Sequence, residues 1–208
     1  MDLWQCPVVV TGAASGLGAE TARHLAEAGA RVTAIDIDEV RVRRVGEAIE
    51  GLAIACDLSD TVATEAAFAK AREAHGPARI LVNCVGLAQS ERILGDDGPM
   101  PLDHFRRLVD VNLISTFNMM RLAAGDMAKL PPQANGERGL IIFTASISAY
   151  EGQSGEAAYA ASKGGVVSMI LPAARELGTY GIRVVGIAPG LFGTATLFAM
   201  ERDLDSRL

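Results

Sequence analysis

The chain has 208 residues, of which 50% are hydrophobic and 21% are charged, so it is long enough to form one domain around a large core. Its formal net charge of -6 argues against nucleic acid as the main partner, although a local basic pocket for a phosphorylated substrate remains compatible with it. The three cysteines are odd in number and far apart, the N-terminus lacks the features of a signal peptide, and no apolar run is long enough to span a membrane. We therefore expect one domain over residues 1–208 in a reducing, cytoplasmic compartment, with no membrane partner and no metal site.

Short apolar runs alternate with longer helical patterns along the chain. Strands are predicted at residues 6–12, 31–36, 79–86, 139–146 and 182–190, with a weaker strand at 51–57. Helices are predicted at 18–30, 102–129 and 157–174, and surface loops at 95–101 and 131–139. Near-continuous apolar strands indicate a sheet that is covered on both faces, and the alternation indicates right-handed parallel crossovers. The sequence therefore predicts an α/β fold, a Rossmann-like doubly wound parallel sheet with helices on both faces.

A glycine-rich turn, TGAASGLG from Thr11 to Gly18, follows the first strand and opens the first helix. Its glycines, Gly12, Gly16 and Gly18, let the backbone approach a pyrophosphate, which the free N–H groups at a helix N-terminus can bind. A generic joint between a strand and a helix would also need a glycine turn. The order of strand, turn, helix and second strand favours dinucleotide binding over that alternative.

Asp36 lies at the end of the second predicted strand, downstream of the glycine turn. A carboxylate there can accept hydrogen bonds from the ribose hydroxyls of adenosine and would repel a 2′-phosphate, so the position favours NAD over NADP. Arg41, Arg43 and Arg44 come too late in the chain to reach the ribose, and we expect them to form a solvated helix face. The alternative for Asp36 is a solvated aspartate after an ordinary strand.

Tyr159 and Lys163, in the segment YAASK, share one face of a predicted helix because they are spaced i, i+4. A cation beside a phenol favours the phenolate and lowers its pKa, which suits a catalytic base. Taken alone, the pair is better explained by helix packing with a nearby surface lysine. Ser146 upstream and the predicted dinucleotide fold favour catalysis instead.

The chain resembles the short-chain dehydrogenase/reductase family through motifs that occur in family order over nearly its whole length. The motifs are TGAASGLG, Asp57 after the third strand, NCVG at 83–86, Asn112 in DVNL, Ser146 in TAS, YAASK, and PGLFGT at 189–194. Within the family, the stretches DVNLISTFNMMRLAAGDM, SAYEGQ and GIRVVGIAPGLFGT are similar to the type II 3-hydroxyacyl-CoA dehydrogenases, also described as 17β-hydroxysteroid dehydrogenases.

The resemblance implies an NAD-dependent oxidoreductase of fatty acid metabolism that interconverts a secondary alcohol and a ketone, with a 3-hydroxyacyl-CoA thioester as the expected substrate. Tyr159 would be the catalytic acid/base, and Lys163 would lower its pKa and bind the nicotinamide ribose. Ser146 would hydrogen-bond the reacting oxygen, although Thr144 or Ser148 could supply that hydroxyl instead.

Further site residues are implied by the same resemblance. Asn112 would hold a water that links the lysine to solvent, or merely satisfy buried backbone groups. Asp57 would contact adenine, or else cap a helix. Gln153 would face the substrate, or else be an ordinary surface glutamine. The full set of cofactor contacts expected from the family is Gly12, Ser15, Gly16, Leu17, Gly18, Asp36, Asp57, Leu58, Asn83, Gly86, Tyr159, Lys163, Pro189, Gly190 and Thr194.

Two stretches depart from the family pattern. NCVG stands where NNAG is usual, so Cys84 replaces a polar support, although the loop should still pack. Family chains usually continue beyond PGLFGT to a last strand, whereas this sequence ends at LFAMERDLDSRL, which we expect to be a remnant of the substrate lid. We therefore expect the C-terminal strand to be missing and the sheet edge to be open. A hydroxysteroid, small-alcohol or sugar dehydrogenase, and a truncated non-catalytic binding subunit, remain alternatives.

Relatives in this family pair through two helices, which predicts a homodimer, or a homotetramer if the last strand is present. The helix at 102–129 carries more apolar residues than one sheet face needs, although both helices could simply cover the sheet. The helix at 157–174 carries small residues that permit close contact, and Pro172 is expected to bend or end it. The residues concerned are Leu108, Val111, Ile114, Phe117 and Met120 on the first helix and Ala158, Ala161, Ser162 and Gly165 on the second.

Overall fold

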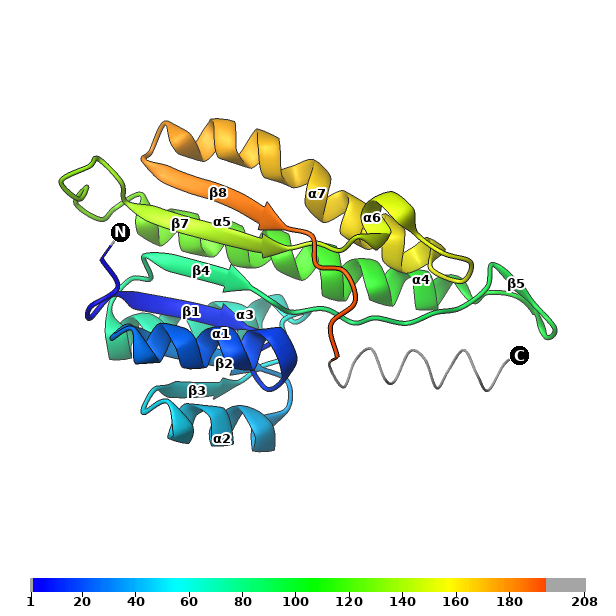
Figure 1. Ribbon diagram of the computed structural model, residues 1–208, viewed down its shortest axis with the longest axis horizontal. Helices are drawn as coiled ribbons and strands as arrows, with labels where there is room; N and C mark the ends of the chain where they lie inside the picture. The colour runs from blue at the N-terminus through cyan, green and yellow to red at the C-terminus, as the bar shows by residue number, and fades with distance from the viewer. Residues whose placement is uncertain (1, 194–208) are drawn as a thin grey trace.

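The computed structural model describes residues 2–193 and confirms the predicted parallel sheet (Figure 1). Six strands pair in parallel in the order β3-β2-β1-β4-β7-β8, so the chain starts at the centre of the sheet and winds outward in both directions. The strands are β1 (Pro7–Thr11), β2 (Arg31–Asp36), β3 (Leu52–Ala55), β4 (Ile80–Asn83), β7 (Gly139–Thr144) and β8 (Ile182–Ile187). In such sheets ligands bind beyond the carboxyl ends of the strands where the winding reverses, here between β1 and β4.

Helices cover both faces of the sheet, as the sequence predicts (Figure 1). They are α1 (Gly16–Glu27), α2 (Glu39–Ala48), α3 (Thr61–His75), α4 (Leu102–Val109), η1 (Asp110–Ile114), α5 (Ser115–Met127), α6 (Ser148–Glu151) and α7 (Ala157–Gly178). Consecutive strand residues point to opposite faces, so Val8 and Val9 belong to different cores. Val8 packs in the core under α1 and α2, and Val9 packs in the core under α3, α5 and α7.

The long helix predicted at 102–129 is interrupted. Its middle turn, η1, is a π-helix that separates α4 from α5. A π-turn inserts one extra residue, which rotates the side chains that follow and is frequent at functional sites. Asn112 lies in this turn and is completely buried. The hydrophobic pattern did not reveal the interruption, because apolar residues continue through it.

The helix predicted at 157–174 runs further, to Gly178, so Pro172 does not end it, and a bend at Pro172 stays a prediction. Proline removes one backbone hydrogen bond, which would reach the carbonyl of Ser168. Both residues lie on the exposed side of α7, where water can satisfy that carbonyl, so the helix can continue. The loop predicted at 95–101 holds a short hairpin of β5 (Leu94–Gly95) and β6 (Gly98–Pro99), which projects from one end of the molecule (Figure 1).

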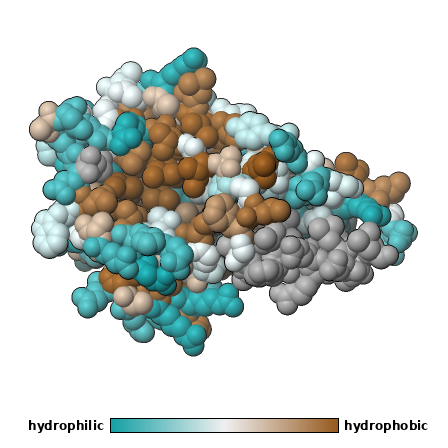
Figure 2. All heavy atoms as spheres, in the orientation of Figure 1, coloured by the Kyte–Doolittle hydropathy of each residue, from teal (hydrophilic) through white to brown (hydrophobic). Residues whose placement is uncertain are grey.

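An apolar surface lies over β4, β7 and β8 on the face that carries α1 and α2 (Figure 2). Within residues 2–193, β8 pairs only with β7 and lies at the edge of the sheet. Val185 and Ile187 on β8 are exposed, and Leu140 and Ile142 on β7 are half-buried. In the described part of the chain, the sheet therefore has the open edge that the sequence predicts.

Candidate active site

A cavity of about 880 Å³ lies at the carboxyl ends of the strands and is lined by residues from the glycine turn, the strand ends and α7. Most of the predicted site residues meet there, although they come from segments far apart in the sequence. The predicted residues that line it are Gly12, Ser15, Gly16, Leu17, Gly18, Asp36, Asp57, Leu58, Gly86, Ser146, Tyr159, Lys163, Pro189 and Gly190. Asn83, Asn112 and Gln153 do not line it, and Thr194 lies outside the described residues.

The glycine turn forms one wall of this cavity. Gly12 has a positive φ of 64°, and a Cβ there would lie 2.7 Å from the backbone of Cys84, so only glycine fits. Ser15 precedes α1 without a side-chain cap, and no acidic residue occupies the first turn of that helix. The first N–H groups of α1 therefore have no intrahelical partner and can bind the pyrophosphate of a dinucleotide.

Asp36 is fixed at the end of β2. Its carboxylate accepts a hydrogen bond from the N–H of Ala14 and another from the N–H of Asp38, both 3.0 Å long. It faces the cavity beside Ile37, and the basic residues among the described lining lie on α4 and α7 rather than on β2 or the glycine turn. This arrangement fits ribose hydroxyls, which can donate to a carboxylate.

Asp57 follows β3 and does not cap the next helix, so its capping alternative is wrong. Its carboxylate accepts hydrogen bonds from the N–H and the hydroxyl of Ser59, at 2.9 and 2.7 Å. Asp60 caps α3 instead, by accepting from the N–H groups of Val62 and Ala63. Asp57 therefore remains available to the cavity that it lines.

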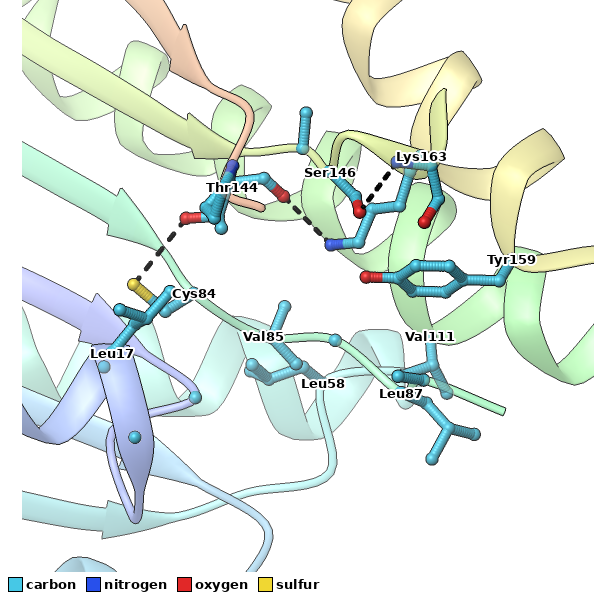
Figure 3. A pocket seen from close by; sticks show the side chains of 18 of the residues that line it. Leu17, Leu58, Cys84, Val85, Leu87, Val111, Thr144, Ser146, Tyr159 and Lys163 are labelled. Atoms are coloured by element: carbon cyan, nitrogen blue, oxygen red, sulfur yellow. Dashed lines mark hydrogen bonds between the residues drawn. The ribbon is translucent and has the colours of Figure 1, made fainter. Parts of the chain in front are cut away.

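Lys163 is buried in the wall of the cavity opposite the glycine turn (Figure 3). Its Nζ donates a 2.9 Å hydrogen bond to the carbonyl of Thr144. A Cβ on Gly86 would lie 3.1 Å from this nitrogen, so the glycine lets the loop after β4 pass close to the lysine. Burial lowers the pKa of Lys163 to about 8, which leaves the side chain mainly protonated at neutral pH.

Tyr159 and Ser146 line the same part of the cavity as Lys163, across from Leu17 of the glycine turn (Figure 3). Burial raises the pKa of the Tyr159 hydroxyl, while its hydrogen bond with Ser146 lowers it and the carboxylate of Glu156 raises it. Burial has the largest effect on the pKa of Tyr159, and the Nζ of Lys163 donates to the Thr144 carbonyl, so the lowering of this pKa by Lys163 stays a prediction. Of the three candidate hydroxyls, only that of Ser146 affects the pKa of Tyr159; it also accepts a 3.2 Å bond from the N–H of Ser148, while the Thr144 hydroxyl donates to Cys84.

Asn112 holds the loop after β4 against α7. Its Oδ1 accepts a 2.7 Å bond from the N–H of Leu87, and its Nδ2 donates to the carbonyl of Leu87 at 3.0 Å and to Ser162 at 2.9 Å. The Ser162 hydroxyl in turn donates to the carbonyl of Tyr159 at 2.7 Å. The contacts show that Asn112 satisfies buried backbone groups, and its role in holding a water stays a prediction. The sequence assigned Ser162 only to helix contacts and not to the site, although it belongs to YAASK.

Three further expectations concern residues at the margin of the site. Asn83 accepts a 3.2 Å bond from the Thr11 hydroxyl between β1 and β4, so it joins strands rather than lining the cavity. Gln153 lies in a separate shallow depression with Ile93 and Leu94. Cys84 lines the cavity and its burial raises the pKa of the thiol, so the altered NCVG loop still packs.

Among residues 2–193, no three histidine, cysteine or acidic side chains are grouped closely enough to hold a metal ion. None of the helices in the same range is long and apolar enough to cross a membrane.

The model of the family described as short chain dehydrogenase matches residues 7–205. The chain belongs to the short-chain dehydrogenase family. It is 44% identical to the 3-hydroxyacyl-CoA dehydrogenase type-2 of Bos taurus over 195 residues, which cover 91% of this chain and 74% of the bovine protein. It is 42% identical to the protein of the same name from Homo sapiens over 198 residues, covering 92% of this chain and 75% of the human protein.

Solved structures of other short-chain dehydrogenases agree with the fold. The crystal structure of 3-hydroxyacyl-CoA dehydrogenase type-2 from Mycobacterium avium matches with a TM-score of 0.87 and 35% identity, over 93% of this chain and 77% of that one. The 3-ketoacyl-(acyl-carrier-protein) reductase of Brucella melitensis, complexed with NADH, matches with a TM-score of 0.86 and 30% identity, over 98% of this chain and 83% of that one. This short-chain dehydrogenase is therefore an oxidoreductase that uses a nicotinamide cofactor.

Proposed function

We propose that the chain oxidises a 3-hydroxyacyl thioester to the 3-oxoacyl thioester with NAD, or runs the reverse reaction with NADH. The observation that carries this proposal is that Ser146, Tyr159 and Lys163 share one cavity with the glycine turn and Asp36. The names of the bovine, human and mycobacterial relatives support the acyl-CoA substrate.

NAD is the proposed cofactor because of the charge at the end of β2. The carboxylate of Asp36 is fixed by two backbone N–H groups and faces the cavity, where a 2′-phosphate would meet a like charge. The turn from Gly12 to Gly18 contains no basic residue that could receive this phosphate. The bound cofactor would accept hydride from the carbon that carries the hydroxyl group.

The side chains of the site would handle the proton and the oxygen. Tyr159 would take the hydroxyl proton of the substrate, and Ser146 would donate a hydrogen bond to the same oxygen as it becomes a carbonyl. A phenol has a pKa near 10, so Tyr159 needs a stabilised phenolate to act at neutral pH. The buried ammonium of Lys163, which donates to the Thr144 carbonyl in the same wall of the cavity, would supply the positive charge that stabilises this phenolate.

The substrate assay compares alcohols of different classes. Purified protein is given NAD and 3-hydroxybutyryl-CoA, a hydroxysteroid or a polyol, and NADH is followed by its absorbance. The proposal expects NADH mainly from the thioester. A chain that oxidises the steroid or the polyol faster than the thioester would contradict the proposed substrate class.

We also propose a homodimer through the helices of the face opposite α1. Ile114 is 54% exposed and Phe117 is 49% exposed, which is unusual for large apolar residues on a helix that also packs on a sheet. Among the small residues expected at this contact, Ala158 and Ser162 are buried within the chain and Gly165 packs against Leu113, whereas Ala161 is exposed. The proposed dimer therefore rests on the exposed apolar residues.

A further inference from the structure

A carboxylate stands at the substrate end of the cavity without a role in the proposed chemistry. Glu156 precedes α7, lines the cavity and lies three residues before Tyr159, which places both on one side of the helix start. Its Oε2 accepts a 2.9 Å hydrogen bond from the N–H of Gln153, so the carboxylate is anchored. The N-terminus of a helix also favours a negative charge at this place.

The charge of Glu156 is not neutralised by an ion pair with any residue from 2 to 193. The cations that line the cavity among the described residues belong to other partners or elements: Lys163 donates to the Thr144 carbonyl, Arg106 pairs with Asp103, and Arg107 lies with Arg106 on α4. The carboxylate raises the pKa of the Tyr159 hydroxyl. Its field therefore reaches the place where the substrate oxygen has to bind.

A substrate with a negative charge close to its reacting carbon would be repelled by the carboxylate of Glu156. In a free 3-hydroxy acid the carboxylate is two bonds from the carbinol carbon, whereas in a thioester, ester or amide the same acyl group is neutral. We propose that Glu156 is a charge filter, which makes the site favour secondary alcohols with a neutral neighbouring acyl group over the corresponding free acids. This inference rests on the proposed function and adds the feature of the substrate that the site selects.

The filter can be tested with 3-hydroxybutyrate and 3-hydroxybutyramide, which have nearly the same size and differ in charge. Two unit charges a few Å apart near a protein surface interact strongly enough that we expect kcat/KM to favour the amide by about tenfold or more in the unaltered protein. Glu156→Gln keeps an oxygen that can accept the Gln153 N–H, so the fold should persist. This variant should gain activity on the acid and lower the amide-to-acid ratio by about tenfold.

Glu151→Gln is the matched control, because Glu151 carries the same charge, is exposed at the end of α6 and does not itself line the cavity. Its amide-to-acid ratio should equal that of the unaltered protein. An equal fall in both variants would show a general effect of net charge and overturn the filter. An unchanged ratio in Glu156→Gln would overturn it as well.

Failure of the proposed function would look different, since the unaltered protein would form no NADH from 3-hydroxybutyryl-CoA. The filter is then judged from binding, by competing acetoacetate and acetoacetamide for the protein–NADH complex and following the fluorescence of bound NADH. Tighter binding of the amide, with the difference abolished in Glu156→Gln, supports the filter. Equal binding of the acid and the amide to the unaltered protein overturns it.

Discussion

Asn112→Ala should destabilise the fold more than an ordinary surface change, because the side chain makes three hydrogen bonds in a fully buried place. A hydrogen bond contributes about 1 kcal/mol net, and a buried backbone group left without a partner costs about 1–3 kcal/mol. Loss of the bonds to both backbone groups of Leu87 and to Ser162 should therefore lower the free energy of unfolding by about 3–5 kcal/mol. For a domain of this size that corresponds to a fall in Tm of roughly 10 °C.

Thermal unfolding followed by circular dichroism measures this loss. Asn118→Ala is the matched control, because Asn118 is also a buried asparagine and lies one helical segment further, on α5, but its side chain accepts one hydrogen bond, from Arg121. We expect the control to lose about 1 kcal/mol. A fall in Tm for Asn112→Ala that is no larger than that of Asn118→Ala would refute the view that Asn112 holds the loop to α7.

Three other predictions follow from single residues. In fluorescence titrations NAD should bind more tightly than NADP, because Asp36 repels the 2′-phosphate, and Asp36→Ala should reduce this difference in affinity. Equal affinities in the unaltered protein would contradict the role of Asp36. Burial lowers the pKa of Lys163 from 10.5 to about 8. Between these two pH values the unfolded chain binds more protons than the folded protein, so the free energy of unfolding rises with pH. Lys163→Met should therefore be more stable than the unaltered protein at pH 7, by up to about 3 kcal/mol, with an advantage that shrinks above pH 8; a constant difference would contradict the buried charge. Phe117→Asp should convert the proposed dimer to a monomer in light scattering, and an unaltered protein that is already monomeric at micromolar concentration would refute the dimer.

The sheet and the main walls of the site were predictable because they follow from local patterns. The strands β1 and β4, predicted from apolar runs, are confirmed. In the glycine turn between β1 and α1, Gly12 has the positive φ angle that favours glycine. Asp36 lies at the end of β2 as expected, because a strand boundary fixes the position of the residue that ends it.

The contacts between distant segments were not predictable from the sequence. The π-turn at η1 aims Asn112 at Leu87, and no hydrophobic periodicity encodes that extra residue. The spacing of Tyr159 and Lys163 shows that they share a helix face, but it does not show that the Nζ reaches the Thr144 carbonyl instead. Glu156 could have been noticed from its i, i+3 spacing to Tyr159, although only the fold shows that it lines the cavity.

The central claim, that Tyr159 is the acid/base of a dehydrogenase, is tested most directly by Tyr159→Phe. This change removes the hydroxyl whose pKa Ser146 lowers and keeps the ring at the start of α7. NADH formation from 3-hydroxybutyryl-CoA should fall by about 10²–10⁴-fold or more, which is the usual scale of acid–base catalysis, while the affinity for NAD stays nearly unchanged. If the variant kept more than about a tenth of the activity, the loss would be smaller than that scale and Tyr159 would not be the acid/base.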